Sequence, residues 1–142
     1  MIPAASLGWS ESLSTGVALL DEQHQAIFRW CAELERAAAE QRTLFAAYTI
    51  ARLHDYMRAH FAAEEAFMRA ADFPKLAQHV VEHQTFRRMV GNLQVESVGR
   101  DITADTIEVL RTWLVGHICG HDLEYVPYLA ERFGAQRVSS GT

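Results

Sequence analysis

The chain has 142 residues, of which 49% are hydrophobic and 22% are charged, and its formal net charge is −5. This length suits one domain with a single core over residues 1–142, and the composition excludes the disordered and fibrous classes of protein. An acidic chain without a local basic cluster has no electrostatic reason to bind nucleic acid or an anionic membrane surface.

The sequence shows neither the pattern of a signal peptide nor an apolar run long enough to cross a bilayer. We therefore expect a soluble cytoplasmic protein that does not insert into membranes. The two cysteines, Cys31 and Cys119, lie far apart and outside any CxxC motif. Reduced thiols are expected rather than a disulfide framework.

The first predicted element is an extended arm over residues 1–18, in which Trp9 and Leu13 are expected to lie along the rest of the fold. Apolar residues at three- and four-residue steps then predict a helix over residues 19–41. A second helix is predicted to begin with Thr43 as its N-cap and to stop before Pro74.

Pro74 is expected in the first turn of a third helix, which stops at the stretch "ESVGRDIT". Thr103 is expected to cap a fourth helix, in which Pro127 kinks or restarts the last turns. The tail, residues 134–142, has nothing to bury and is expected to be loose.

Four amphipathic segments of comparable length, joined by short loops, predict an all-α fold. Each helix is too weak alone and must bury one face against its neighbours. We therefore predict an antiparallel up-down-up-down four-helix bundle over residues 19–133, with the arm laid on it.

Each predicted helix carries polar residues where its period predicts burial. These are His24, then His60 and Glu64, then His79 and His83, and finally His117, His121 and Asp122. A step of four residues turns an α-helix by about 40°. His60 and Glu64 therefore share one face, as His79 and His83 do, and both pairs can point to a common centre.

Two interpretations of these residues compete. A single histidine on an apolar face is usually a core residue whose ring hydrogen-bonds to a carbonyl group. Burying several imidazoles and two carboxylates together costs several kcal/mol for each group unless they are paired or bind a metal. The coincidence across four helices favours a metal site, because one kind of ion satisfies all of these groups.

The type and number of ligands narrow the choice of metal. The cluster contains no thiolate, which disfavours a structural zinc site, and five or six imidazoles are too many for one catalytic zinc. The same imidazoles are too rich in nitrogen for calcium or magnesium. Two adjacent irons fit better, although no glutamate has a histidine three residues later, so the ferritin-like ligand scheme is disfavoured.

Four stretches in order carry a resemblance to a known family: "DEQH", "HFAAEEAFM", "FPKLAQHVVEHQTF" and "WLVGHICGHDLEY". From Trp9 to about Phe133 the chain resembles the hemerythrin family, specifically its bacterial single-domain members. The resemblance implies two iron ions, which Glu64 and Asp122 bridge together with a solvent-derived oxo or hydroxo group. The remaining ligands that it implies are His79, His83 and His117 on one iron, and His24 and His60 on the other.

With three bridges serving both irons, the iron with three histidines has six ligands, whereas the iron with two has five and keeps one position open. The resemblance implies that dioxygen binds there reversibly. The chain would then be an oxygen carrier, store or delivery protein rather than an enzyme, with an oxygen-using enzyme as a partner.

Three alternatives stay open at this point. The first is an oxygen- or redox-sensing domain that acts through a signalling partner or a fused signalling module, with "QRVSSGT" as the start of a linker. The second is a di-iron nitric oxide or peroxide reductase, although the sequence shows no evident proton relay. The third is a zinc or manganese protein of unrelated purpose.

Asp122 is the weakest geometric link, because five residues after His117 turn an α-helix by about 140°. Gly116 and Gly120 flank His117, and we expect a single π-type turn to bring His117 and Asp122 onto one face. If the α-helix is unbroken there, His121 is favoured as the ligand instead.

Several neighbouring residues have weaker expectations. Glu65 is expected to be solvated or to contact a ligand, His54 to be an ordinary partly exposed histidine, and Cys31 a small core residue. Tyr125 and Tyr128 follow Asp122 closely, and surface packing is expected for them, with a hydrogen bond to the surroundings of the ligands as the alternative. Six apolar residues are candidates for the walls of the dioxygen pocket: Ile27, Phe28, Phe61, Phe86, Trp113 and Leu114. Plain core packing is an equal alternative for each of them.

Overall fold

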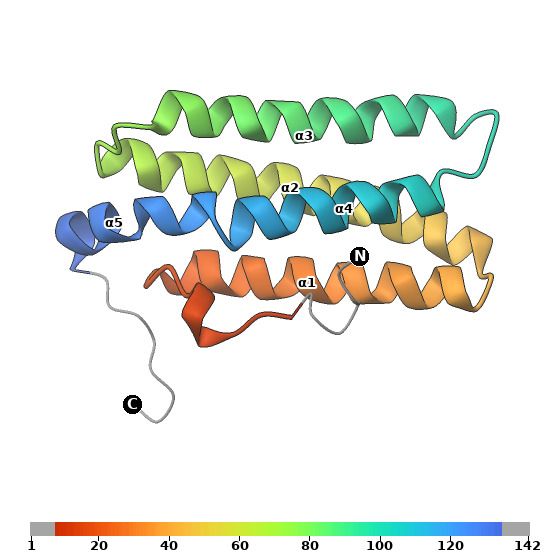
Figure 1. The fold of residues 1–142 in the computed structure, drawn as a ribbon, viewed down its shortest axis with the longest axis horizontal. Coiled ribbons are helices and arrows are strands. Elements are labelled where there is room, and N and C mark those ends of the chain that lie inside the picture. Colours follow the sequence, from red (N-terminus) through yellow and green to blue (C-terminus); the bar gives the residue numbers. More distant parts are fainter. Residues whose placement is uncertain (1–7, 135–142) are drawn as a thin grey trace.

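Four long helices lie side by side and antiparallel in the computed structural model, which describes residues 8–134 (Figure 1). They are α1 (Ala18–Ala39), α2 (Thr43–Ala70), α3 (Leu76–Glu96) and α4 (Thr103–Ile118). A short 3-10 helix, η2 (Glu11–Leu13), precedes them, and η3 (His121–Tyr125) and α5 (Val126–Phe133) follow α4. The all-α four-helix bundle that the sequence predicts is confirmed.

Each long helix packs against the next one in the chain, and α4 packs back against α1. The connections are short, and two of them begin with a left-handed residue, Gln41 with φ 56° and Asp72 with φ 54°. Behind these residues the backbone nitrogen of Arg42 donates to Ala37 O at 2.9 Å, and that of Phe73 to Met68 O at 3.0 Å. Such bonds satisfy the last carbonyl groups of a helix and reverse the chain.

The predicted helix starts are close to the observed ones, but the predicted caps are wrong. Thr43 is the first residue of α2 rather than its N-cap. Asp101 takes the role expected of Thr103, because its Oδ1 accepts a hydrogen bond from the backbone nitrogen of Thr103 at 2.9 Å. Pro74 precedes α3 instead of lying in its first turn. Pro127 stands at the start of α5 and restarts the helix, as predicted.

Residues 8–17 lie along the bundle, but η2 interrupts the expected extended conformation. Leu13 is buried in the core, and Trp9 packs against it. Asp21 of α1 anchors the arm, since its carboxylate accepts hydrogen bonds from Ser14 Oγ at 2.6 Å and from the backbone nitrogen of Thr15 at 2.7 Å.

The interior of the bundle consists of two hydrophobic clusters with a polar layer between them. In α1, His24 lies between Leu20 of the smaller cluster and Ile27 of the larger one. The same order recurs in α2, where His60 and Glu64 lie between Met57 and Met68. The other members of the smaller cluster are Ala71, Phe73, Tyr125 and Leu129.

Among the described residues, no helix combines the length and the apolar composition that crossing a bilayer requires. Residues 1–7 of the predicted arm and residues 135–142 of the predicted tail lie outside the described range. The division of the chain into arm, bundle and tail therefore stays a prediction.

Candidate metal centre

All seven residues that the sequence predicts as ligands lie together in the polar layer, and each is at most 3% exposed. They come from five elements, so no single stretch of the chain builds the cluster. In chain order they are His24, His60, Glu64, His79, His83, His117 and Asp122. The four-residue steps in α2 and α3 bring each predicted pair onto one face of its helix.

The cluster divides into two overlapping groups, and within each group the candidate ligand atoms all lie within 4.8 Å of one another. Both groups contain Glu64 and Asp122. The larger group adds His79, His83 and His117, which we call the three-histidine half. The smaller group adds His24 and His60, which we call the two-histidine half.

Glu64 divides its two oxygens between the halves. Its Oε1 lies 2.9 Å from His83 Nε2 and 3.1 Å from His79 Nε2. Its Oε2 lies 3.3 Å from the Nε2 atoms of both His24 and His60. One carboxylate thus offers one oxygen to each half.

Asp122 divides its oxygens in the same way. Its Oδ1 lies 2.8 Å from His117 Nε2 and 2.9 Å from His79 Nε2. Its Oδ2 lies 3.0 Å from His24 Nε2. Two carboxylates that each connect both halves are the arrangement that a pair of adjacent cations requires.

Several buried atoms at this centre have no hydrogen-bond partner. They are both ring nitrogens of His24, Nε2 of His60, Nδ1 of His117 and both carboxylate oxygens of Asp122. A buried polar atom without a partner costs about 1–3 kcal/mol, so a fold retains such atoms when something else binds them. Imidazole nitrogens and carboxylate oxygens without a thiolate suit iron, manganese or zinc, and the residues present fit two such ions.

Burial and the charge of Glu64 both act to raise the pKa of Asp122, yet the charge of His117, whose Nε2 lies 2.8 Å away, outweighs them and holds this pKa well below its usual value. Burial likewise acts to raise the pKa of Glu64, but the charge of His60 and hydrogen bonds from other histidines lower it well below normal. Both carboxylates therefore stay ionised and attract positive charge into the cluster.

The imidazoles respond to the same charges. Burial lowers the pKa of a histidine, but the close carboxylates of Asp122 and Glu64 outweigh it and raise the pKa of His24 to about 10 and that of His79 to about 10. Burial also opposes the shift at His117, whose pKa the charge of Asp122 raises to about 9. In the absence of cations, protons would balance the charge of the carboxylates.

The connection between His117 and Asp122 differs from the prediction. α4 ends at Ile118, the chain turns at Gly120, and η3 begins at His121. The expected π-type turn is wrong, because the α-helix stops rather than widens. A Cβ atom at Gly120 would lie 2.6 Å from the carbonyl oxygen of Gly116, so this turn requires a glycine.

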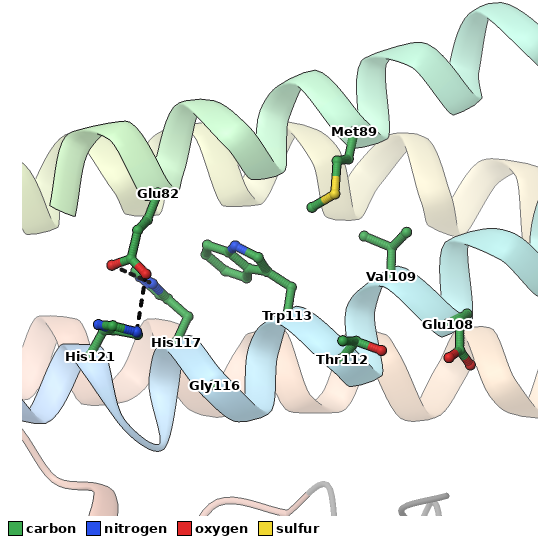
Figure 2. Close-up of a pocket in the computed structure, with 9 residues that line it drawn as sticks. All are labelled: Glu82, Met89, Glu108, Val109, Thr112, Trp113, Gly116, His117 and His121. Carbon is green, nitrogen blue, oxygen red and sulfur yellow. Dashed lines mark ion pairs between the residues drawn. The ribbon is translucent and has the colours of Figure 1, made fainter. Parts of the chain in front are cut away.

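The break in the helix decides between Asp122 and His121. Asp122 is fully buried and faces the cluster. His121 has 51% of its side chain exposed and forms an ion pair with Glu82 at 3.2 Å (Figure 2). It forms another with Glu124, also at 3.2 Å. The alternative in which His121 replaces Asp122 is therefore not supported.

Two of the outer ring nitrogens have hydrogen-bond partners, whereas Nδ1 of His24 and Nδ1 of His117 have none. The Nδ1 atom of His83 lies 2.7 Å from Glu65 Oε2, and that of His60 lies 2.8 Å from Gln23 Oε1. Because both partners are oxygen acceptors, Nδ1–H donates and Nε2 keeps its lone pair for a metal. Glu65 thus contacts a ligand, which was one of its two expected roles.

Tyr125 contacts the cluster directly. Of its two expected roles, surface packing is wrong and the hydrogen bond is confirmed, because the ring is fully buried and its hydroxyl donates to Glu64 Oε2 at 2.8 Å. Its place three residues after the ligand Asp122 was the signal in the sequence. Tyr128, by contrast, is 38% exposed and packs against Phe73.

Two of the aromatic residues proposed as walls contact ligand rings directly. Phe61 stacks on His83 with ring centroids 3.9 Å apart, and Trp113 stacks on His117 at 4.1 Å. The other four, Ile27, Phe28, Phe86 and Leu114, are buried in the larger hydrophobic cluster. The same contacts therefore pack the core and exclude water from the site.

The remaining expectations concern residues outside the cluster. His54 is half-buried and does not belong to either ligand group. Cys31 is buried in the core, and Cys119 is exposed. Neither thiol belongs to the cluster, which agrees with the prediction that the site uses no thiolate.

The chain is similar to known proteins over most of its length. Residues 15–129 match the family described as "Hemerythrin HHE cation binding domain". A bacteriohemerythrin of Stenotrophomonas maltophilia (strain R551-3) is 31% identical over 122 residues, which cover 85% of this chain and 80% of that protein. A bacteriohemerythrin of Pseudomonas aeruginosa (strain LESB58) is 32% identical over 123 residues, with 86% and 80% covered. A crystal structure of wild-type hemerythrin has a TM-score of 0.78 and 30% identity, and covers 85% of this chain and 95% of that one.

Proposed function

Because this chain belongs to the hemerythrin family, we propose that it binds dioxygen reversibly at two iron ions held by the seven clustered residues. The observation that carries the proposal is the division of each carboxylate between the halves. Glu64 and Asp122 each present one oxygen to the three-histidine half and the other to the two-histidine half. This arrangement supports two bridged ions better than one ion.

The proposed ligands follow from the two halves. His79, His83 and His117 would hold one iron, His24 and His60 would hold the other, and Glu64 and Asp122 would serve both, together with a solvent-derived oxo or hydroxo group. The first iron would then have six ligands and the second five, which would leave a position for a small molecule on the two-histidine half.

When bound, the two ferrous ions supply the two electrons that dioxygen takes up. The chain's own residues hold the ligands in place and exclude water. Gln23 and Glu65 accept hydrogen bonds from ligand rings and fix which nitrogen faces inward. Ile27, Phe61 and Leu114, each at most 2% exposed, follow or precede ligands on three helices and keep the surroundings apolar.

Tyr125 is the one phenol in contact with a proposed bridge. Burial, followed by the charges of Glu64 and Asp122, raises the pKa of Tyr125 well above its usual value. The hydroxyl therefore keeps its proton and acts as a fixed donor to Glu64 rather than as an acid. A site without a ready acid favours release of dioxygen unchanged over turnover to peroxide.

The test is anaerobic reduction followed by exposure to air, with iron analysis and visible absorption. We expect two irons per chain and a charge-transfer band that appears with air and disappears under vacuum. His83→Ala should lose iron, whereas His121→Ala, which removes an exposed histidine outside the cluster, should keep both ions.

The same experiment separates the competing functions. Rapid and permanent oxidation in air would contradict a carrier and favour a sensing domain. Consumption of nitric oxide or peroxide in the presence of a reductant would favour a reductase. Zinc or manganese in place of iron in the purified protein would refute the proposal altogether.

A further inference from the structure

A pocket of about 390 Å³ opens on the outside of the bundle between α3 and α4 (Figure 2). Met89, Val109 and Trp113 supply its apolar lining, and Glu82 and Glu108 lie at its opposite ends. No lysine or arginine of the described residues lines it. The volume suits a single planar ring system, and the flexible thioether of Met89 can adapt to one.

The floor of this pocket is connected directly to the proposed metal centre. The indole of Trp113 stacks on the imidazole of His117, with ring centroids 4.1 Å apart and an interplanar angle of 17°. His117 is only 2% exposed, and its Nε2 lies 2.8 Å from Asp122 Oδ1. Its buried Nδ1 has no hydrogen-bond partner and lies 3.8 Å from Glu82 Oε2 at the edge of the pocket. A molecule in the pocket therefore touches an aromatic ring that contacts a proposed iron ligand.

The absence of a side chain at Gly116 is a second observation that bears on the pocket. It lies inside α4, where glycine destabilises a helix relative to alanine. A Cβ atom there would meet nothing within 4 Å, so packing does not demand a glycine. Because Gly116 lines the pocket, a longer side chain at this position would project into the space that the pocket occupies.

We propose that this pocket binds a planar aromatic one-electron donor that carries positive charge, and that Trp113 and His117 pass its electron to the iron of the three-histidine half. Glu108 and Glu82, the second of which also contacts His121 at 3.2 Å, attract a cation and disfavour anionic carriers such as flavin nucleotides, and the indole adds a cation–π contact. The proposal rests on the function proposed above, and it gives the oxidised protein a route back to the ferrous state.

In each step the donor loses one electron and one ferric ion becomes ferrous, so reduction of both irons consumes two donor molecules. No bond within the donor breaks, and the bridging oxo group takes up one proton from solvent when it becomes hydroxo. The electron arrives at the three-histidine half, and the open position of the two-histidine half stays free for dioxygen.

Binding is tested first, without any turnover, by calorimetric titration of the oxidised iron-loaded chain with oxidised methyl viologen. We expect Gly116→Leu to weaken binding at least tenfold, and Glu108→Gln to weaken it several-fold at low salt. Gly91→Leu is the matched control, because Gly91 is also helical, also has nothing within 4 Å of its Cβ position, and lines a different groove. Equal binding by wild type and Gly116→Leu would overturn the proposal.

Electron transfer is tested by stopped-flow reduction of the diferric chain with reduced methyl viologen or with dithionite, a small anion. We expect Gly116→Leu to slow reduction by viologen at least tenfold and to leave reduction by dithionite within about twofold, with iron content unchanged.

The outcomes also separate the two proposals. If the chain binds dioxygen reversibly but does not bind viologen, the proposed function stands and the proposed donor site in the pocket is refuted. A chain that binds viologen in the pocket but holds no redox-active iron overturns electron transfer and the dioxygen function together.

Discussion

Tyr125 donates a hydrogen bond to Glu64 across the interior of the bundle, with 2.8 Å between Oη and Oε2 and neither side chain exposed. The acceptor is the carboxylate oxygen that also faces His24 and His60 at 3.3 Å. A residue of η3 therefore orients a carboxylate of α2, and it does so on the half of the site where the open position is proposed.

Replacing Tyr125 with phenylalanine removes this hydrogen bond and keeps the ring, which packs edge-to-face on Phe73. Since the acceptor is a buried carboxylate, we expect the free energy of unfolding to fall by about 1.5–3 kcal/mol. Thermal denaturation of the iron-loaded protein measures the loss. Tyr128→Phe is the control, because Tyr128 packs on the same ring from the surface. Equal losses in both variants would show that the contact with Glu64 contributes nothing.

Glu65 holds the outer nitrogen of His83, and its side chain is only 23% exposed. Glu65→Ala removes the acceptor that fixes the ring and its tautomer, so we expect the affinity for the three-histidine iron to fall by about 10–100-fold. Competition with an iron chelator measures this affinity. Glu22→Ala removes an exposed glutamate of α1 and should leave the affinity unchanged. Unaltered competition in Glu65→Ala would contradict the assigned role.

The helices and the ligands could be predicted from the sequence for the same physical reason. Burial follows the helical period, so polar residues such as His60 and Glu64 stand out on an apolar stripe, and a four-residue step fixes their common direction. The break before Asp122 could not be predicted in this way. It depends on how closely Gly120 approaches the carbonyl group of Gly116, which is a relationship between backbones and leaves no periodic pattern.

The partners of the ligands were also hidden, because they depend on tertiary packing. Tyr125 meets Glu64, which lies 61 residues earlier in the chain, and Gln23 meets His60, which lies 37 residues later. The local sequence pattern does not show which residues meet across such separations in the chain. The cap of α4 was predicted at the wrong residue, because Asp101 and Thr103 lie two positions apart and both residue types suit an N-cap.

Gly120→Ala tests the break between α4 and η3. The added Cβ would lie 2.6 Å from Gly116 O, so the turn must shift and carry Asp122 with it. We expect loss of iron from the purified protein and a stability lower by about 1–3 kcal/mol, the range for strained backbone positions. Gly116→Ala is the control, because its Cβ meets nothing and alanine favours the helix by about 1 kcal/mol. Two irons in both variants would show that Asp122 does not need this turn.

Asp21→Ala tests the attachment of the arm. Ser14 Oγ and the backbone nitrogen of Thr15 both donate to Asp21, and both residues are at most 1% exposed. Their loss of a partner should cost about 1–3 kcal/mol for each buried donor, and the arm should detach. Limited proteolysis should then cut within residues 8–17 faster than in wild type. Asp55→Ala changes an exposed residue of α2, and its arm should be cut as slowly as that of the wild type. If the arm of Asp21→Ala is cut equally slowly, Asp21 does not anchor it.

The two cysteines should differ in reactivity and in its dependence on pH. Burial, followed by the charge of Glu35, raises the pKa of Cys31 to about 12, and burial raises that of the exposed Cys119 less strongly. The thiolate is the reactive form of cysteine. The rate at which Cys119 reacts with a thiol reagent should therefore rise about tenfold per pH unit below its pKa, whereas Cys31 should not react up to about pH 9. A disulfide reagent should therefore titrate one thiol in the folded protein and two in denaturant. Cys119→Ser should remove the fast thiol, and reaction of two thiols in the folded state would contradict the burial of Cys31.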